Sequence, residues 1–248
     1  MATLILLRHG ESIWNRQNRF TGWVDVSLSR AGIVEAERAA VLLGEERLDV
    51  VFTSALLRAQ DTAYEVLKRN RHCAQYVRVH DELKRDWYAH FVSLPAETSE
   101  LKIYVSEMLN ERYYSDLQGL RKDEAAVHFG SEQVHQWRRS YDIPPPNGES
   151  LQMTATRVMP YYLERIAPLL RLGYTVLVCA HGNSLRAMIM YIEQLTPEQI
   201  LTCEVKTGTP FVYRFDADLK LAGKHILEAR EVDAASAASG TAQDVEGT

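Results

Sequence analysis

The sequence predicts an α/β protein whose central strands are parallel. Two short and almost wholly apolar runs, at residues 4–7 and 174–180, have the composition of strands buried on both faces of a sheet. Apolar residues recur at helical spacing in segments such as 30–43 and 150–170, which predicts amphipathic helices. The chain has 248 residues, 46% hydrophobic and 25% charged, enough for one large α/β domain or two small ones.

The first strand ends in Arg8-His9-Gly10. Ligands bind at the carboxyl ends of central strands in open α/β sheets. An imidazole there can act as a nucleophile, and an adjacent arginine can hold an anion through two parallel N–H bonds. We expect Gly10 to leave room for a ligand beside the backbone. A solvated Arg-His pair at a strand end is the alternative, and the triplet alone does not decide between them.

The second apolar strand also ends in His-Gly, at His181 and Gly182, and a helix follows at once. Asn183 or Ser184 can cap that helix, whose free N–H groups favour a phosphate. The two strand ends can meet if both strands lie in the middle of the sheet. We then expect His9 to attack a phosphoryl group while a protonated His181 stabilises its charge.

The elements after the first motif follow from turn and capping residues. Residues 13–23 read as a loop, in which Asn15, Thr21 and the N–H of Gly22 are candidate substrate contacts; alone, they would be ordinary turn residues. A helix at 30–43 is capped by Ser29 and ends at Gly44. We expect its buried face to comprise Ile33, Ala36, Ala40 and Leu43.

A second strand is expected at 48–52, and Thr53-Ser54 is expected to cap a helix over 55–68. Arg58 lies in the first turn of that helix, beside a strand end, and can point into the same crevice. A lone arginine is more often a surface residue.

The middle of the chain carries further candidates. Residues 80–88 look helical, and Pro95 marks a loop. Aromatic neighbours can raise the pKa of Glu111 and suit it to proton transfer, although a surface glutamate is the simpler interpretation of this stretch alone. Helices are expected from about 119 to 129 and around Trp137. The second carries Arg138-Arg139, a pair that is usually a solvated face.

The last third of the chain begins after a stiff loop at 144–148. A long helix is expected over 150–170, kinked or interrupted by Pro160 and Pro168. A last strand is expected at 209–215, with Pro210 at its start or on an edge. From about residue 233 the composition favours a disordered tail.

Composition excludes several classes. The net charge of −5 and a pI near 5.9 argue against general binding to nucleic acid or anionic membranes. Three cysteines without paired spacing suggest neither a disulfide framework nor a zinc site, and Cys179 reads as a core residue. No apolar run reaches membrane-spanning length, and the N-terminal run is interrupted too early for a signal peptide. We therefore expect a cytoplasmic enzyme.

The motifs closely resemble a known family. Those that resemble the histidine phosphatase superfamily are Leu6-Leu7-Arg8-His9-Gly10-Glu11-Ser12, Asn15, Phe20-Thr21-Gly22-Trp23 and Ala180-His181-Gly182-Asn183-Ser184-Leu185-Arg186. Those that resemble its cofactor-dependent phosphoglycerate mutases are Leu109-Asn110-Glu111-Arg112-Tyr113-Tyr114, Gly119-Leu120-Arg121-Lys122 and Trp137-Arg138-Arg139-Ser140-Tyr141. The resemblance implies a three-layer α/β/α domain over about 1–232 with a mostly parallel sheet. It also implies interconversion of 3-phosphoglycerate and 2-phosphoglycerate in glycolysis and gluconeogenesis, through a phosphohistidine and 2,3-bisphosphoglycerate.

The resemblance also implies roles for individual residues. His9 becomes the nucleophile, and Glu111 moves the proton of the substrate hydroxyl. The residues implied around the phosphoryl group are Arg8, Asn15, Arg58, His181, Gly182 and Asn183, and those for the rest of the substrate are Ser12, Thr21, Gly22, Tyr114, Lys122, Arg138 and Arg139. A phosphoglycerate carries a carboxylate as well as a phosphate, so a second cationic cluster agrees with this chemistry and favours a binding role for the arginine pair.

The sequence departs from the mutase pattern at Tyr113, where His is usual, and at Ser115, where Gly is usual. The segment at 80–102 is longer than usual, and the loop after Pro146 is shorter. These changes of length concern the cover of the site and the oligomer interface more than the chemistry. In the mutases it resembles, a C-terminal tail covers the site, and we expect the segment from about 228 to do so here.

Two other classes stay open at this stage. A phosphomonoester hydrolase of the same fold would pass the phosphoryl group to water. A non-catalytic binding module would have no need of His9, His181, Arg8, Arg58 and Glu111 together. We expect 2,3-bisphosphoglycerate as the primer, no metal, no nucleic-acid or membrane partner, phosphoglycerates as substrates, and a homodimer or higher homo-oligomer.

Overall fold

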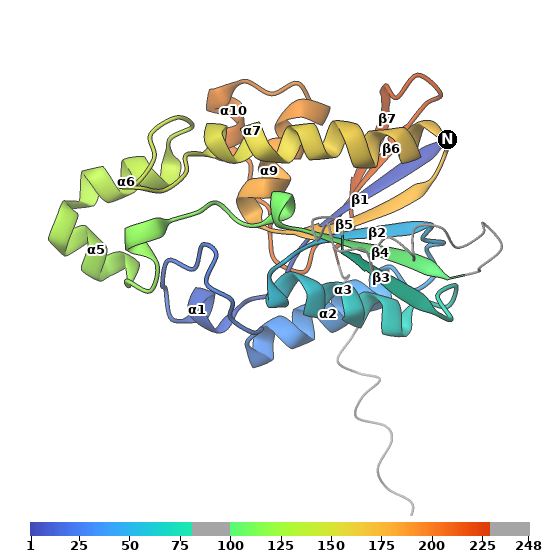
Figure 1. Ribbon diagram of the computed structural model, residues 1–248, viewed down its shortest axis with the longest axis horizontal. Helices are drawn as coiled ribbons and strands as arrows, with labels where there is room; N and C mark the ends of the chain where they lie inside the picture. The colour runs from blue at the N-terminus through green and yellow to red at the C-terminus, as the bar shows by residue number, and fades with distance from the viewer. Residues whose placement is uncertain (81–99, 229–248) are drawn as a thin grey trace, which may run out of the picture.

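The strands form one seven-stranded sheet in the order β3-β4-β2-β5-β1-β6-β7 (Figure 1). The computed structural model describes residues 1–80 and 100–228. Within these residues, the five strands from β3 to β1 are parallel, and β6 and β7 are antiparallel to their neighbours. The strands are β1 Ala2–Arg8, β2 Val50–Ser54, β3 Tyr76–His80, β4 Leu101–Ser106, β5 Thr175–Ala180, β6 Pro210–Phe215 and β7 Leu221–Ile226.

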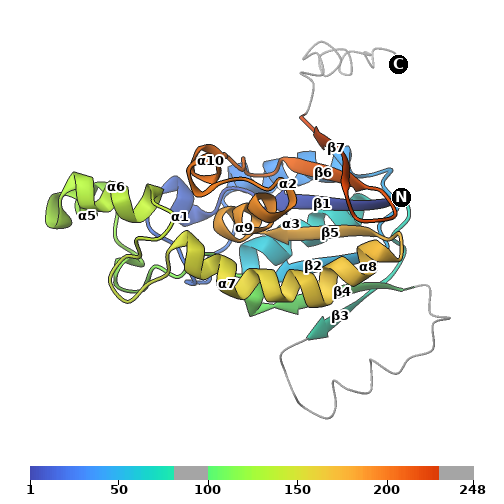
Figure 2. The same ribbon diagram turned by 90° about the horizontal axis from the view of Figure 1, so that it is seen from above.

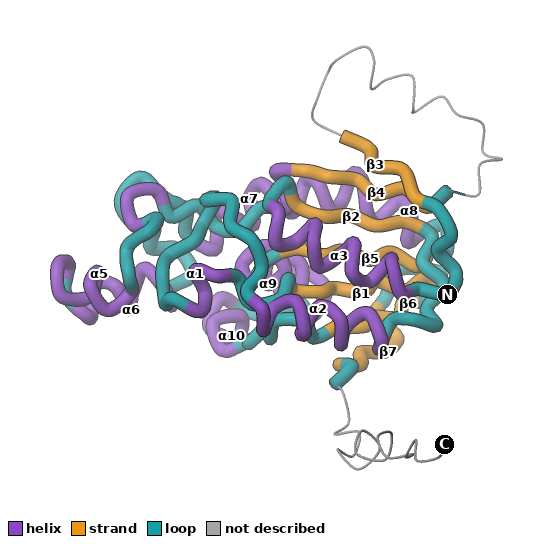
Figure 3. The backbone as a smooth tube through the Cα atoms, turned by 90° about the horizontal axis from the view of Figure 1, so that it is seen from below, coloured by secondary structure: helices purple, strands orange, loops and turns teal. Residues whose placement is uncertain are grey.

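Helices cover both faces of the sheet, which confirms the three-layer α/β/α architecture (Figures 2 and 3). Helices α2 and α3 pack on one face, and α7, α8 and α9 pack on the other. Helices α5 and α6 lie together beyond one end of the sheet. The helices are α1 Ile13–Arg16, α2 Arg30–Leu42, α3 Leu57–Arg69, α5 Lys122–Phe129, α6 Ser131–Arg139, α7 Leu151–Tyr161, α8 Ala167–Arg171, α9 Gly182–Ile192 and α10 Pro197–Thr202.

Strand β1 is buried on both faces, as its composition predicts. Leu4 and Leu6 belong to the core under α7, α8 and α9, whereas Ile5 and Leu7 belong to the core under α2 and α3. Side chains alternate between faces in a strand, so a continuous apolar run feeds both cores. Strand β5 does the same, with Cys179 fully buried in the second core, as expected.

The two His-Gly strand ends are neighbours in the sheet. Strands β1 and β5 are paired in parallel, and their last residues, Arg8 and Ala180, are register partners. His9 and His181 therefore leave the sheet side by side at the same edge. This confirms the expectation that the two motifs meet in the middle of the sheet.

The expectation for Gly10 is wrong, because this glycine makes room for a helix and not for a ligand. A Cβ atom on Gly10 would lie 2.1 Å from the carbonyl oxygen of Gly32 in α2, and one on Gly32 would lie 2.0 Å from the carbonyl oxygen of Glu11. The buried face of α2 accordingly comprises Gly32, Ala36, Ala39 and Ala40. Ile33, expected on that face, is 44% exposed.

Other local expectations are corrected by the sheet. Thr53 and Ser54 do not cap a helix, because they are the last residues of β2 and Thr53 is paired with Cys179 of β5. Helix α3 begins at Leu57 after Leu56, which makes no side-chain cap. Ladder pairing to two neighbouring strands outweighs the capping preference of two hydroxyl residues.

The expected interruption of the long helix lies between its two prolines. The segment Tyr162–Ile166 is a single π-helical stretch between α7 and α8. Pro160 lies inside α7, and Pro168 lies at the start of α8, where a missing N–H costs least. Prolines and π-helical turns are both common causes of a bend or interruption in an α-helix.

Three strands were not anticipated. β3 ends at His80, which is therefore not the start of a helix over 80–88 as expected, and residues 81–88 lie outside the described part of the chain. β4 begins at Leu101, and β7 extends the sheet beyond β6. Pro210 therefore starts a strand but is not on an edge. The expected loop at Pro95 and tail from 233 lie outside the described residues as well, and the domain boundary at 232 stays a prediction. No helix in residues 1–80 and 100–228 is long and apolar enough to cross a membrane.

Candidate active site

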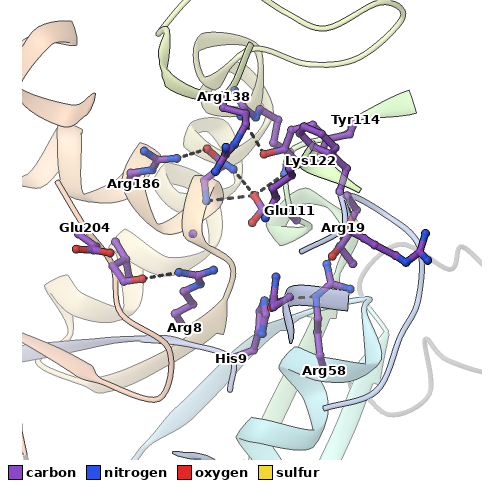
Figure 4. Close-up of a pocket in the computed structure, with 18 of the residues that line it drawn as sticks. Arg8, His9, Arg19, Arg58, Glu111, Tyr114, Lys122, Arg138, Arg186 and Glu204 are labelled. Carbon is purple, nitrogen blue, oxygen red and sulfur yellow. Dashed lines mark hydrogen bonds between the residues drawn. The ribbon is translucent and has the colours of Figure 1, made fainter. Parts of the chain in front are cut away.

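A cavity of about 190 Å³ opens where β1 and β5 end, between the sheet and helices α5, α6 and α9 (Figure 4). Most of the residues expected at a site line this cavity. They are Arg8, His9, Asn15, Thr21, Gly22, Arg58, Glu111, Tyr114, Lys122, Arg138, Arg139, Gly182 and Asn183. Of the expected set, only Ser12 and His181 are not in the lining.

His9 presents Nε2 for chemistry. Its Nδ1 lies 2.6 Å from the carbonyl oxygen of Gly10, which can only accept, so Nδ1 carries the proton. Nε2 then holds the lone pair, and Arg58 Nε donates to it at 3.3 Å. Burial and the charges of Arg58 and Arg8 hold the pKa of His9 well below its usual value. The ring is therefore neutral near pH 7, which suits a nucleophile.

The ring of His181 packs edge-on against that of His9, with 4.8 Å between ring centroids. Its Nε2 is 2.7 Å from Ser54 Oγ, which already accepts the N–H of Leu56. The Ser54 hydroxyl has one proton that it can donate to Nε2, and in that arrangement the proton of His181 lies on Nδ1. That nitrogen is buried and has no partner among the described residues.

The expected protonated His181 concerns a site that holds a phosphoryl group, whereas the ligand-free site favours the neutral ring. Burial is the main cause that lowers its pKa far below the usual value, and the charges of Arg58 and Arg8 lower it further. A neutral ring with its proton on Nδ1 can still donate a hydrogen bond to an anion. A bound phosphoryl group would also supply the negative charge that favours the imidazolium.

Several buried polar atoms of the lining residues can donate a hydrogen bond to a ligand. Arg8 Nε, Thr21 Oγ1 and Arg112 Nε, all from lining residues, are buried without a hydrogen-bond partner in the described residues. Buried donors in folded proteins are normally satisfied, so this group indicates an anionic ligand. The other guanidinium nitrogens of Arg58 are already held by the carbonyl oxygens of Gly22 and Val24.

Glu111 is buried in the cavity wall as a carboxylate. Its Oε1 accepts from the N–H groups of Arg112 at 2.7 Å and Asn183 at 3.1 Å and from the side-chain amide of Asn183 at 2.7 Å. Burial alone would raise its pKa, but these hydrogen bonds and the charges of Arg8 and Arg58 outweigh burial and lower it. The expectation that aromatic neighbours raise this pKa is therefore wrong.

A second group of cations lines the side of the cavity formed by α5 and α6. It comprises Lys122, Arg138 and Arg139. Burial and the neighbouring arginines lower the pKa of Lys122 to about 8, and burial also lowers that of Arg138. Like charges brought together out of water cost free energy, which a dianionic ligand would offset.

Two residues of the expected set support the loop over the cavity. Ser12 caps α1, and Asn15 Oδ1 accepts from both the N–H and the hydroxyl of Ser12, so Ser12 is fully buried away from the lining. Gly22 has φ +52°, and a Cβ atom there would meet Gln118 Oε1 at 2.2 Å. The positive φ favours glycine at this position.

Sequence reasoning assigned no role to seven other lining residues, namely Arg19, Phe20, Arg112, Arg186, Cys203, Glu204 and Val205. Arg112 was detectable as the neighbour of Glu111, and Arg186 by its i+3 spacing from Asn183. The stretch 203–205 carries no motif, and only folding brings it to Arg8, whose Nη1 donates to the Val205 carbonyl at 2.8 Å. In all, eight cationic and two acidic side chains line the cavity.

Comparison with known proteins agrees with this geometry. The histidine phosphatase superfamily (branch 1) matches residues 4–87 and 90–221. The chain belongs to the histidine phosphatase superfamily. A 2,3-bisphosphoglycerate-dependent phosphoglycerate mutase of Pseudoalteromonas atlantica is 60% identical over 228 residues, which is 92% of this chain and 100% of that protein. A protein of the same name from Gloeothece citriformis is 48% identical, again over 92% and 100% of the two chains.

Solved structures of other proteins share the superfamily fold. A mycobacterial glucosyl-3-phosphoglycerate phosphatase in complex with VO3 has a TM-score of 0.68 and 24% identity, covering 86% of this chain and 93% of its own. Bacillus stearothermophilus YhfR has a TM-score of 0.69 and 22% identity, covering 89% and 94%. At these identities the likeness concerns the fold alone. The superfamily's phosphoryl chemistry fits the paired histidines described above, and no group of three metal-ligating side chains occurs within residues 1–80 and 100–228.

Proposed function

We propose that this chain is a 2,3-bisphosphoglycerate-dependent phosphoglycerate mutase, which interconverts 3-phosphoglycerate and 2-phosphoglycerate. The observation that carries the proposal is the second cationic group at Lys122, Arg138 and Arg139, in the same cavity as His9. A substrate with a phosphate at one end and a carboxylate at the other needs both groups of cations. The mutase relatives at 48% and 60% identity support the same substrate class.

In this mechanism His9 Nε2 carries the phosphoryl group. Arg8 and Arg58 neutralise its charge, and the Nδ1 proton of His181 is available to one of its oxygens. No step needs a metal ion, because the guanidinium groups supply the positive charge that Mg²⁺ supplies elsewhere. Asn15, Gly182 and Asn183 complete the wall around the group.

Glu111 moves the proton when the phosphoryl group is transferred. The bond from His9 Nε2 to phosphorus breaks as the substrate hydroxyl oxygen bonds to phosphorus, and Glu111 takes the hydroxyl proton. A carboxylate with a lowered pKa is in the correct form to accept it. In the second half of the reaction, the phosphoryl group on the other oxygen of the bisphosphoglycerate returns to His9 Nε2. Glu111 then gives its proton to the oxygen that loses the phosphoryl group.

The residues present fit the proposed primer. 2,3-Bisphosphoglycerate supplies the phosphoryl group that loads His9 at the start. Its charged groups match the cations beside His9 and the cations of α5 and α6, and the unpartnered Arg8 Nε and Arg112 Nε are free donors for it. The remainder of the bisphosphoglycerate molecule would contact Thr21, Gly22 and Tyr114. We also propose that the protein is a homodimer or higher homo-oligomer and is located in the cytoplasm.

A coupled mutase assay with and without 2,3-bisphosphoglycerate tests the function, with phosphate release measured in parallel. We expect mutase turnover that depends on the primer, little phosphate release, and an acid-labile label on His9 that is absent in His9→Ala. The competing function is a phosphomonoester hydrolase of the same fold. Fast phosphate release without mutase turnover would replace the proposal by that function.

A further inference from the structure

Helix α9 contains an arginine that the proposed mechanism does not use. Arg186 lines the cavity, one helical turn after Asn183, and its Nη2 donates to Asn183 Oδ1 at 2.5 Å. Asn183 Nδ2 in turn donates to Glu111 Oε1 at 2.7 Å. Arg186 and Glu111, both labelled in Figure 4, are therefore joined through the side chain of Asn183.

The chemistry of the three groups permits only one arrangement. A guanidinium can only donate hydrogen bonds, and a carboxylate can only accept them. The Asn183 amide between them must therefore turn its oxygen to Arg186 and its NH₂ to Glu111. Each bond in such a chain polarises the next, so Arg186 strengthens the bond that Asn183 makes to Glu111.

The two oxygens of Glu111 are consequently not equivalent. Oε1 accepts from three donors, which are the N–H groups of Arg112 and Asn183 and the amide of Asn183. A proton on Oε1 would point at these donors, so protonation at Oε1 is disfavoured. Oε2 accepts no hydrogen bond from the described residues, and a Cβ atom placed on Gly182, another lining residue, would lie 3.8 Å from it.

We propose that Arg186 is a positioning residue, which acts through Asn183. It keeps Glu111 Oε1 in hydrogen bonds with the protein, so that the exchangeable proton binds at Oε2. The substrate hydroxyl would then meet a base of fixed orientation, at one atom only. The inference deepens the proposed function, since it concerns the proton that Glu111 moves there.

Charge alone must be separated from positioning, because several cations surround Glu111. Those that act on it or bond its backbone are Arg8 from β1, Arg58 from α3, Lys122 from α5 and Arg157 from α7. Arg139→Met is therefore the matched control. It removes one cation from the same cavity, and Arg139 makes no hydrogen bond to Asn183 or Glu111 within the described residues.

The primary measurement is the titration of Glu111 in the resting protein. Carboxyl-¹³C glutamate labelling follows it by NMR, and the resonance is assigned by its loss in Glu111→Gln. We expect Arg186→Met to raise the pKa of Glu111 by about one unit, since it weakens a hydrogen bond to the charged form. The shift in Arg139→Met should be less than half as large. Equal shifts in the two variants, or none, would overturn the inference.

Kinetics provide the second measurement. Arg186→Met should lower kcat by about tenfold, with the acid limb of the pH profile moved upward, whereas Arg139→Met should act chiefly on KM. A rise in KM alone for Arg186→Met would make Arg186 a substrate ligand and overturn the inference. If Arg186→Met does not fold, Arg186→Lys takes its place, with a smaller shift expected in the same direction.

The titration keeps the two proposals apart. An inactive wild-type protein in which Arg186→Met still raises the pKa of Glu111 would refute the mutase function but not the positioning role. A mutase in which Arg186→Met leaves the pKa of Glu111 unchanged would refute the positioning role but not the mutase function.

Discussion

At the scale of single residues, the site is organised around two histidines that are buried without charge. His9 and His181 both have pKa values far below 6.5, first because of burial and then because of neighbouring arginines. In an unfolded chain each would bind a proton near pH 6.5. The folded state therefore excludes protons that the unfolded state takes up.

This difference predicts how stability depends on pH. The contribution of each histidine is fully present above about pH 6.5 and is lost as the pH falls below it, by about 1 kcal/mol between pH 7 and 5.5. We expect the fall in the free energy of unfolding over this range to be smaller in His181→Gln than in wild type. His225→Gln, at an exposed position, is the control and should keep the wild-type slope. Equal slopes in all three proteins would contradict the burial argument.

The lowered pKa of Lys122 predicts how kcat/KM depends on pH in the alkaline range. Its pKa of about 8 means that the ligand-free enzyme loses this positive charge as the pH rises through 8. We expect kcat/KM for phosphoglycerate to fall above that pH. Lys122→Arg keeps its charge at higher pH and should move the fall upward. A pH profile from 6 to 10 for both proteins measures this, and coincident alkaline limbs would assign the fall to another group.

At the scale of elements, α7 holds the segment that carries Glu111. Arg157 of α7 donates to the carbonyl oxygens of Met108, Asn110 and Glu111, and it pairs with the carboxylate of Glu149 at 2.8 Å. The same carboxylate accepts the N–H of Tyr113. One guanidinium thus fixes both the path of the chain before Glu111 and the loop at 148–150.

Removing this guanidinium should destabilise the fold. Arg157→Met removes one donor from three carbonyl groups and the ion-pair partner of a largely buried carboxylate, and we expect a loss of about 3 kcal/mol in the free energy of unfolding. Lys206→Met is the control, because it breaks the exposed pair with Glu228 and should cost less than about 1 kcal/mol. Urea unfolding measures both. Losses of the same size would mean that the Arg157 contacts stabilise no more than an exposed pair does.

At the scale of the whole molecule, charge is distributed unevenly. The protein carries a net charge of −5, yet eight cationic and only two acidic side chains line its cavity. Attraction between this cavity and an anionic substrate is screened as salt is added, because the Debye length shortens from about 10 Å at 0.1 M to about 3 Å at 1 M.

We therefore expect KM for phosphoglycerate to rise with KCl concentration while kcat changes little. Arg139→Met, with one cation fewer, should show a higher KM and a weaker dependence on salt. Steady-state kinetics at several salt concentrations test this. An unchanged KM across the range would mean that hydrogen bonds, and not the field of the cavity, dominate binding.

The parts of this architecture that were predictable from the sequence are those with a strong local signal. The almost wholly apolar runs before His9 and His181 revealed two central strands, and the repeated His-Gly ending indicated that they meet. Edge strand β7 has mostly exposed residues and therefore lacks that signal. The pKa of Glu111 was mispredicted, because it depends on hydrogen bonds from Arg112 and Asn183 and on arginine charges that only the folded chain brings close.

The contact between Gly10 and Gly32 has a consequence for how this site can change. The two backbones approach too closely for either glycine to carry a side chain, so neither position can vary unless α2 moves away from the strand. Gly10 also supplies the carbonyl group that sets the tautomer of His9. A helix that never touches the substrate thus limits the substitutions open to the nucleophile's own motif. An engineer who wishes to alter that motif must first redesign the packing behind it.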